Sequence, residues 1–207
     1  MYLKLKRLID IILSLIAMIV LSPIFLIIII AIKIESKGPV LFKQKRIGLR
    51  KTYFNILKFR TMKIDTPKDT PTHLLEDPDQ YITKIGKFLR KTSLDELPQI
   101  WNIFVGEMSI IGPRPALWNQ YDLIAERDKH GANDILPGLT GWAQINGRDE
   151  LPIEVKAKLD GYYVEKASLW LDIKCFFGTI LSVLKSDGVV EGGTGKLIKK
   201  NVSTKDD

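Results

Sequence analysis

Two adjacent carboxylates, Asp95 and Glu96, are the residues of this chain best placed to do chemistry. They lie in the stretch Ser-Leu-Asp-Glu-Leu-Pro-Gln at residues 93–99, between a basic segment and a Gly-Pro-Arg-Pro turn at residues 112–115. We interpret the pair as a reaction centre. A structural alternative exists, because Ser93 and Glu96 have the spacing of a capping box, and Pro98 would interrupt that helix just past its first turn. The stretch alone leaves the cap and the reaction centre both open.

Five basic residues in nearby motifs are candidates for binding phosphate. Lys58 and Arg60 alternate with Phe59 and so would share one face of a strand. Two prolines hold Arg114 in a rigid turn, because each fixes its own φ and restricts the residue before it. A fixed guanidinium suits phosphate oxygens, although solvated or lipid-facing charge is the alternative for each side chain. The candidates are Lys58, Arg60, Arg90, Arg114 and Arg148.

The composition is basic and favours a phosphate-rich partner. The 207 residues carry 31 Lys and Arg against 24 Asp and Glu, a formal net charge of +7. Nucleic acid, anionic lipid or a nucleotide substrate would each suit that surplus. No Ser-His-Asp order, Cys-x-x-Cys pair, Walker loop or Gly-x-Gly-x-x-Gly motif occurs, so hydrolase, zinc and dinucleotide functions lose their usual support. Cys175, the one cysteine, has apolar neighbours that predict a buried thiol.

An apolar run at residues 11–32, interrupted by Ser14 and by the pair Ser22-Pro23, predicts a membrane role. Pro23 removes a backbone donor near the middle of the run, and the Ser22 hydroxyl can bond to the carbonyl left free. Basic residues flank both ends, so the positive-inside rule gives no orientation. The residues leave a kinked span and a re-entrant helix both open. They place Asp10 at the membrane interface or beside a nearby cation.

The remaining patterns predict an α+β fold that is mainly α. Strands at residues 40–44 and 52–59 would form a small hairpin, and helices are expected at residues 81–91, 116–129, 152–166 and 169–184. The last suits an amphipathic helix in the membrane interface, with core packing as the alternative. A glycine-rich turn at residues 137–141 would let backbone amides approach a nucleotide. We expect a membrane helix at residues 1–37, a catalytic domain at 38–185 and a flexible tail at 186–207.

Together these motifs resemble those of bacterial polyprenol-phosphate sugar-1-phosphate transferases. This is the small monotopic phosphoglycosyl transferase family that begins capsule, exopolysaccharide and glycoprotein-glycan assembly. The resemblance covers residues 4–186 and includes the Ser22-Pro23 break, Lys-Phe-Arg-Thr-Met at residues 58–62, the carboxylate stretch, the Gly-Pro-Arg-Pro turn and residues 138–148. One departure is Leu136, where family members often have Arg.

The resemblance implies a re-entrant helix that enters and leaves on the cytoplasmic face of the bacterial inner membrane, with interfacial helices around the active site. It implies that Asp95 attacks the β-phosphate of a UDP-sugar and releases UMP. Polyprenol phosphate, specifically undecaprenyl phosphate, then accepts the phosphosugar. Glu96 matches the partner carboxylate, which holds Mg²⁺ or orients the reacting groups. Asp160 matches an acidic position near the substrate site.

Two rival functions remain open on the residues alone. A non-enzymatic membrane module would bind anionic lipid or nucleic acid and use the carboxylates only as a helix cap. A nucleotide-sugar hydrolase would release UMP without a lipid acceptor. We expect the transferase, with UDP-sugar, polyprenol phosphate and membrane lipid as partners, Mg²⁺ as cofactor and no nucleic acid. A second copy of the chain is a further candidate partner, since an apolar stripe could face lipid or another protomer. The motifs do not select the sugar.

Overall fold

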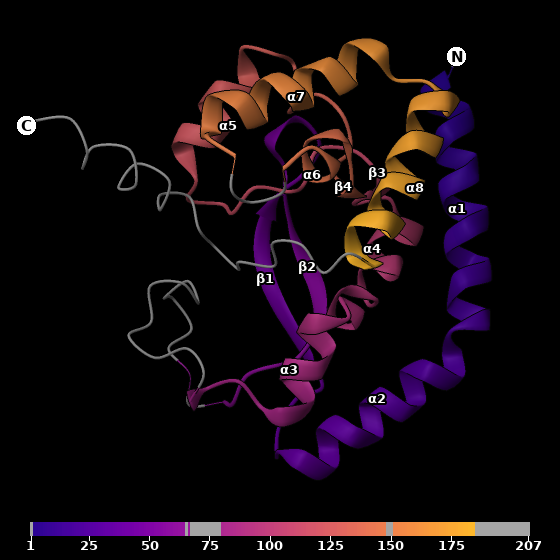
Figure 1. Ribbon diagram of the computed structural model, residues 1–207, viewed down its shortest axis with the longest axis vertical. Helices are drawn as coiled ribbons and strands as arrows, with labels where there is room; N and C mark the ends of the chain where they lie inside the picture. Colours follow the sequence, from indigo (N-terminus) through magenta and orange to yellow (C-terminus); the bar gives the residue numbers. More distant parts are fainter. Residues whose placement is uncertain (1, 65, 67–79, 148–150, 185–207) are drawn as a thin grey trace, which may run out of the picture.

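The computed structural model of the chain describes residues 2–64, 66, 80–147 and 151–184 (Figure 1). Within them the fold is mainly helical, with one antiparallel hairpin and one pair of very short parallel strands, which confirms the predicted α+β class. Arg148 and the predicted tail at residues 186–207 lie outside the described residues. The helices and strands are α1 (Tyr2–Val20), α2 (Ser22–Glu35), β1 (Leu41–Ile47), β2 (Tyr53–Phe59), α3 (Lys84–Lys91), α4 (Gln99–Val105), β3 (Ser109–Ile111), α5 (Tyr121–Asp128), β4 (Gly138–Thr140), α6 (Trp142–Ile145), α7 (Ile153–Lys166) and α8 (Leu169–Leu184).

The apolar N-terminal run forms two helices, α1 and α2, which meet at a bend of 60°. Pro23 has no N–H to donate to the carbonyl of Ile19, four residues back. The Ser22 hydroxyl donates to that carbonyl instead, at 2.7 Å, as the sequence predicted. Among the described residues, no single helix has the length and apolar character to cross a membrane, whereas α1 and α2 taken together do.

Polar side chains on α1 form hydrogen bonds with the C-terminal part of the chain. Helices α1 and α8 lie side by side in Figure 1. Tyr2 and Lys6 both donate to the Asp172 carboxylate on α8, and the Tyr163 hydroxyl on α7 donates to its other oxygen at 2.6 Å. A buried carboxylate is stable only where partners satisfy it. Asp172 therefore joins α1, α7 and α8 at one point.

A second set of contacts joins α1 to α4 and β3. The Arg7 guanidinium donates to the carbonyls of Ile103 and Phe104, at 2.6 and 2.8 Å, near the end of α4. Asp10 accepts the Ile110 N–H at 3.1 Å and is only 2% exposed. Asp10 therefore contacts the backbone of β3 where a cation was expected, and its place at the membrane interface stays a prediction.

The hairpin of β1 and β2 includes Lys58, whereas Arg60 follows the end of β2, so the prediction that the two share one strand face is wrong. The hairpin register places Leu41 opposite Phe59 and Ile47 opposite Tyr53. Phe54 and Ile56 are buried in a core cluster that also contains side chains of the α4 region. Because side chains alternate between the faces of a strand, Lys58 lies on the same face as these two residues. That face is turned toward the segment carrying Asp95 and Glu96.

Glycines allow the backbones around the parallel pair β3 and β4 to approach closely. A Cβ on Gly138 would lie 2.1 Å from the Gly112 nitrogen, and one on Gly141 would lie 2.1 Å from the Gly112 oxygen. No other residue type fits such a backbone contact without displacing it. The glycine-rich turn thus lets two chain segments pack together, while its predicted approach to a nucleotide stays a prediction.

The C-terminal helices α7 and α8 follow the predicted ranges closely. On α8, Leu171 and Cys175 are buried, whereas Trp170, Phe176 and Phe177 are exposed. The helix therefore packs one side into the core and presents an apolar surface on the other. The prediction of a buried Cys175 thiol is confirmed.

The predicted helix at residues 116–129 is shorter than expected, because helix α5 begins only at Tyr121.

We predict that Gly141→Ala destabilises the chain by about 1–3 kcal/mol, since its methyl group would overlap the Gly112 carbonyl and push the backbone apart. Thermal unfolding of the purified chain measures this. Gly178→Ala is the matched control, because its Cβ would meet side-chain atoms of Ile145, at 3.0 to 3.3 Å, and no backbone atom at that distance. Equal stability of the two variants would contradict the proposed backbone contact.

Candidate active site

The carboxylate pair lies in a single 3-10 turn, Leu94–Glu96, between α3 and α4. Ser93 adopts a left-handed conformation with φ of 57° and makes no side-chain cap bond. The α4 helix begins only at Gln99, after Pro98. The capping-box alternative is therefore wrong for this stretch. The left-handed residue instead turns the chain so that both acidic side chains face inward.

Glu96 is held between two cations from distant segments. Its Oε1 accepts a hydrogen bond from Lys58 Nζ at 2.8 Å and another from Arg114 Nη2 at 2.6 Å. Lys58 comes from the end of β2, and Arg114 comes from the Gly-Pro-Arg-Pro turn after β3. The fold thus brings together three of the residues that the sequence singled out.

These contacts set the charge of Glu96. Burial alone would raise the pKa of its carboxyl, but the charges of Arg114 and Lys58 and their hydrogen bonds outweigh that effect. The pKa of Glu96 therefore lies well below its ordinary range. At neutral pH Glu96 is a fixed anion, suited to orienting cations rather than to exchanging protons.

Asp95 lies beside the same lysine and is more deeply buried. Its residue exposure is 6%, and its Oδ2 lies 3.9 Å from Lys58 Nζ. One ammonium group therefore contacts both carboxylates. A lysine shared in this way offsets the repulsion between two adjacent anions, which a low-dielectric site would otherwise make costly.

Arg60 and Arg90 lie near this cluster in the sequence but have structural partners. The Arg60 guanidinium donates to the carbonyls of Ser36 and Lys37, both at 2.9 Å, just after α2. Arg90 donates from Nε to the Thr61 hydroxyl at 2.9 Å. Arg60 therefore connects the segment after α2 to the hairpin. The phosphate-binding roles of both arginines stay predictions.

Asp160 is enclosed in the fold rather than exposed beside Glu96. Its Oδ2 accepts from Arg127 Nε at 2.8 Å and from Nη2 at 2.6 Å, and the remaining Nη1 donates to the Arg114 carbonyl at 2.9 Å. Burial raises the pKa of Asp160, and the Arg127 charge opposes that rise.

Arg127 is a residue of this region that the sequence did not predict. The available signal was its position four residues after Leu123, which places a charge on the buried side of α5.

Asp95 and Glu96 are the candidate metal ligands of this site. No group of three or more His, Cys, Asp or Glu side chains placed to hold a metal occurs among residues 2–64, 66, 80–147 and 151–184. Mg²⁺ is commonly bound by one or two carboxylates together with substrate phosphates and water. Asp95 and Glu96 fit that arrangement, although Glu96 Oε1 would have to give up a cation contact to bind metal.

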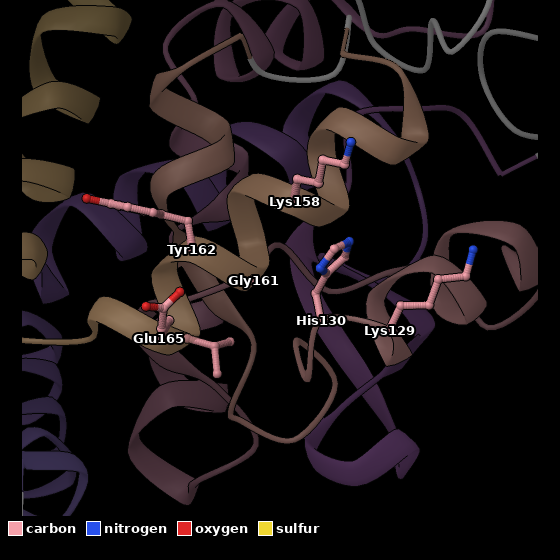
Figure 2. A pocket seen from close by; sticks show the side chains of 7 residues that line it. Lys129, His130, Lys158, Gly161, Tyr162 and Glu165 are labelled. Atoms are coloured by element: carbon pink, nitrogen blue, oxygen red, sulfur yellow. The ribbon is translucent and has the colours of Figure 1, made fainter.

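A separate hollow of about 540 Å³ lies on the outer side of α7, and the close view in Figure 2 shows it. His130 and Lys129, at the end of α5, lie across from Lys158 on α7. None of the predicted site residues within the described part of the chain lines this hollow, so we take the carboxylate cluster as the candidate active site. The lining residues are Lys129, His130, Lys158, Gly161, Tyr162, Val164 and Glu165.

Comparison with known proteins gives a consistent result. The chain is 40% identical over 185 residues to the "Uncharacterized sugar transferase EpsL" of Bacillus subtilis, covering 89% of this chain and 90% of that protein. It is 41% identical over 188 residues to the UDP-glucose:undecaprenyl-phosphate glucose-1-phosphate transferase of Escherichia coli, covering 85% of this chain. It is 36% identical over 195 residues to the UDP-N-acetylgalactosamine-undecaprenyl-phosphate N-acetylgalactosaminephosphotransferase of Aeromonas hydrophila, covering 90% of this chain. The chain spans only 39% and 45% of the last two proteins.

The family described as "Bacterial sugar transferase" matches residues 1–186 of the 207-residue chain. The resemblance found in the motifs is thereby confirmed, and so is the prediction that the protein is an enzyme. The chain belongs to the bacterial sugar transferase family.

Proposed function

We propose that this enzyme is a phosphoglycosyl transferase that moves a sugar 1-phosphate from a UDP-sugar to polyprenol phosphate, specifically undecaprenyl phosphate. The observation that carries the proposal is Glu96 held by Lys58 and Arg114 beside Asp95. Two of the relatives are named for UDP-sugars and undecaprenyl phosphate. Such a reaction would initiate capsule, exopolysaccharide or glycan assembly.

The two carboxylates have different roles in this proposal. Glu96 is fixed by two hydrogen-bonded cations, and its low pKa makes it a weak nucleophile. We therefore assign it to orienting Lys58 and Arg114. Asp95 is the nucleophile, next to the lysine that also contacts Glu96.

The reaction proceeds in two displacements. A carboxylate oxygen of Asp95 attacks the β-phosphorus of the UDP-sugar, and the bond from that phosphorus to the oxygen of the α-phosphate breaks, so UMP leaves with that oxygen. A phosphate oxygen of polyprenol phosphate then attacks the same phosphorus. The aspartyl oxygen–phosphorus bond breaks, and the product is a polyprenyl diphosphosugar with Asp95 restored. A covalent intermediate lets one soluble and one lipid substrate react in turn.

Fixed cations make the attack of an anion on an anion feasible. Lys58 and Arg114 neutralise the diphosphate and the charge on departing UMP. When bound, Mg²⁺ would supply further neutralisation and would be held by Asp95 or Glu96 together with the diphosphate oxygens. Arg60, Arg90 and Arg148 remain predicted contributors to substrate binding.

Membrane attachment brings the site to its lipid substrate. Apolar side chains are exposed on α1, α2 and α8. In Figure 1, α1 forms the right-hand margin of the molecule, α2 forms the lower margin, and α8 lies beside α1. Burial of such a surface in lipid is favourable at about 25 cal/mol per Å². We propose that α1 and α2 form a re-entrant helix on the cytoplasmic face of the bacterial inner membrane, with α8 in the interface.

We predict that Asp95→Asn reduces UMP release from a UDP-sugar by at least about 1,000-fold, because the amide cannot form the phosphosugar ester. The assay uses purified enzyme, Mg²⁺, undecaprenyl phosphate and a panel of UDP-sugars. Mass spectrometry of the wild type, incubated without lipid, should show one phosphosugar on Asp95. Asp134→Asn, at an exposed aspartate, is the matched control.

Two outcomes would contradict the covalent mechanism. Full turnover by folded Asp95→Asn would exclude this residue as the nucleophile. Continuous UMP release by the wild type without undecaprenyl phosphate would indicate a hydrolase. A transferase should instead stop near one UMP per enzyme.

We predict that Glu96→Gln lowers turnover about 100-fold without changing the shape of the pH profile between pH 5 and 8. The folded pKa of Glu96 is depressed, so stability from its ion pairs is present above the unfolded pKa and is lost only as pH falls through the folded value. Glu96 therefore does not titrate in this window. Measurement of kcat and kcat/KM against pH in both enzymes checks this. If the wild-type profile showed an apparent pKa that Glu96→Gln lacks, Glu96 would be the titrating group and the prediction would be wrong.

We predict that cysteines introduced as Lys4→Cys and Lys37→Cys both react with an impermeant maleimide from the cytoplasmic face only. Spheroplasts and inside-out vesicles give the two sides. Burial and the neighbouring Asp172 charge raise the pKa of the native Cys175 thiol to about 12, so this thiol should stay unlabelled until the protein is denatured. Labelling of the two positions from opposite faces would show a span.

A further inference from the structure

The Arg127 guanidinium connects a buried acid to the backbone of an active-site residue. Two of its nitrogens bind Asp160 Oδ2, and the third donates to the Arg114 carbonyl at 2.9 Å. The Arg127 and Asp160 side chains are 4% and 1% exposed. In this arrangement neither side chain is open to a soluble substrate, so any influence on catalysis must pass through their neighbours.

Stability alone is a weak reason for such a pair. Taking two charges out of water is costly, and well-packed apolar residues of similar size often give equal or greater stability. What an apolar pair cannot supply is an N–H donor directed at a carbonyl. The distinctive contribution of Arg127 and Asp160 is therefore the hydrogen bond to Arg114.

The turn around Arg114 is held along its whole length. Each of the four consecutive carbonyls from residue 113 to residue 116 accepts a hydrogen bond of 2.9 or 3.0 Å, and the donors come from three separate segments of the chain. In order, the donors are Gly138 N, Arg127 Nη1, Arg46 Nη1 and Ile47 N. Arg127 and its acid thus fix the main chain at the residue whose own guanidinium reaches Glu96.

We propose that Arg127 and Asp160 are positioning residues, which fix the backbone of Arg114 and so direct its guanidinium to Glu96 and to the diphosphate of the nucleotide sugar. The substrate in this statement rests on the proposed function. Asp160 then acts through Arg127 and Arg114, without contact to substrate or metal.

The first test separates positioning from stability. Removing one partner would leave an unpaired buried charge, so the pair is replaced together as Arg127→Met with Asp160→Leu. We expect this double variant to fold with a Tm close to that of the wild type and to lose about 10- to 100-fold in kcat/KM, because a displaced catalytic group is costly. Glu165→Gln, at an exposed acid on the same helix as Asp160, should keep both values. A folded double variant with full kcat/KM would overturn the proposal.

The second test distinguishes action through Arg114 from direct contact. Asp160→Asn is measured in the wild type and in an Arg114→Ala background. If Asp160 acts through Arg114, its substitution should lower kcat/KM about 10-fold or more in the wild type and less than about 3-fold in Arg114→Ala. Losses that multiply fully in the combined variant would instead indicate direct contact of Asp160 with substrate or metal, and would overturn the proposal.

A third measurement does not depend on turnover. Phenylglyoxal modifies accessible guanidinium groups, and the modified residue is located by mass spectrometry. We expect Arg114 to react several-fold faster in the double variant than in the wild type or Glu165→Gln. An unchanged Arg114 rate would contradict positioning. A raised rate in a chain that releases no UMP from any UDP-sugar would instead uphold positioning and refute the proposed function.

Discussion

The ion pairs of Glu96 with Lys58 and Arg114 are the interaction on which the site depends. They join the end of a hairpin, a 3-10 turn and a proline-bounded turn that are distant in the sequence. Because charge that is removed from water must be matched by nearby charge, the three segments can pack only in an arrangement that brings these groups together. The same requirement places Asp95 beside Lys58, so the packing of these segments also assembles the candidate active site.

Backbone contacts support this arrangement. The glycines of β4 and the following turn allow the segment before Arg114 to approach within a distance that excludes any side chain. Side chains from α5 and β1 then bind the carbonyls of the turn. An arginine on a flexible loop would lose conformational entropy on binding phosphate, whereas one on a fixed turn has already lost most of it. The dense hydrogen bonding around Arg114 thus favours the phosphate-binding role that we propose for it.

The N-terminal helix pair is joined to the site by polar contacts on an otherwise apolar surface. Arg7 and Asp10 bind the backbone near the end of α4 and the start of β3, while Tyr2 and Lys6 meet Asp172 on α8. The position of the reaction centre relative to α1 is therefore fixed. In a lipid surface, this would hold the carboxylates at a constant depth relative to a lipid phosphate headgroup, which suits a substrate that cannot leave the membrane.

The sequence by itself determined the class of the fold, the break at Ser22-Pro23, the hairpin and the identity of the carboxylates and their cations. These features depend on local chemistry: apolar periodicity, the missing N–H of proline and clustered charges of fixed type. Only the tertiary structure decided which cations reach Glu96, that Ser93 caps no helix, and that Arg127 binds Asp160 and the Arg114 carbonyl. These contacts join residues far apart in the chain, and their geometry is set by packing and burial, which residue spacing does not encode.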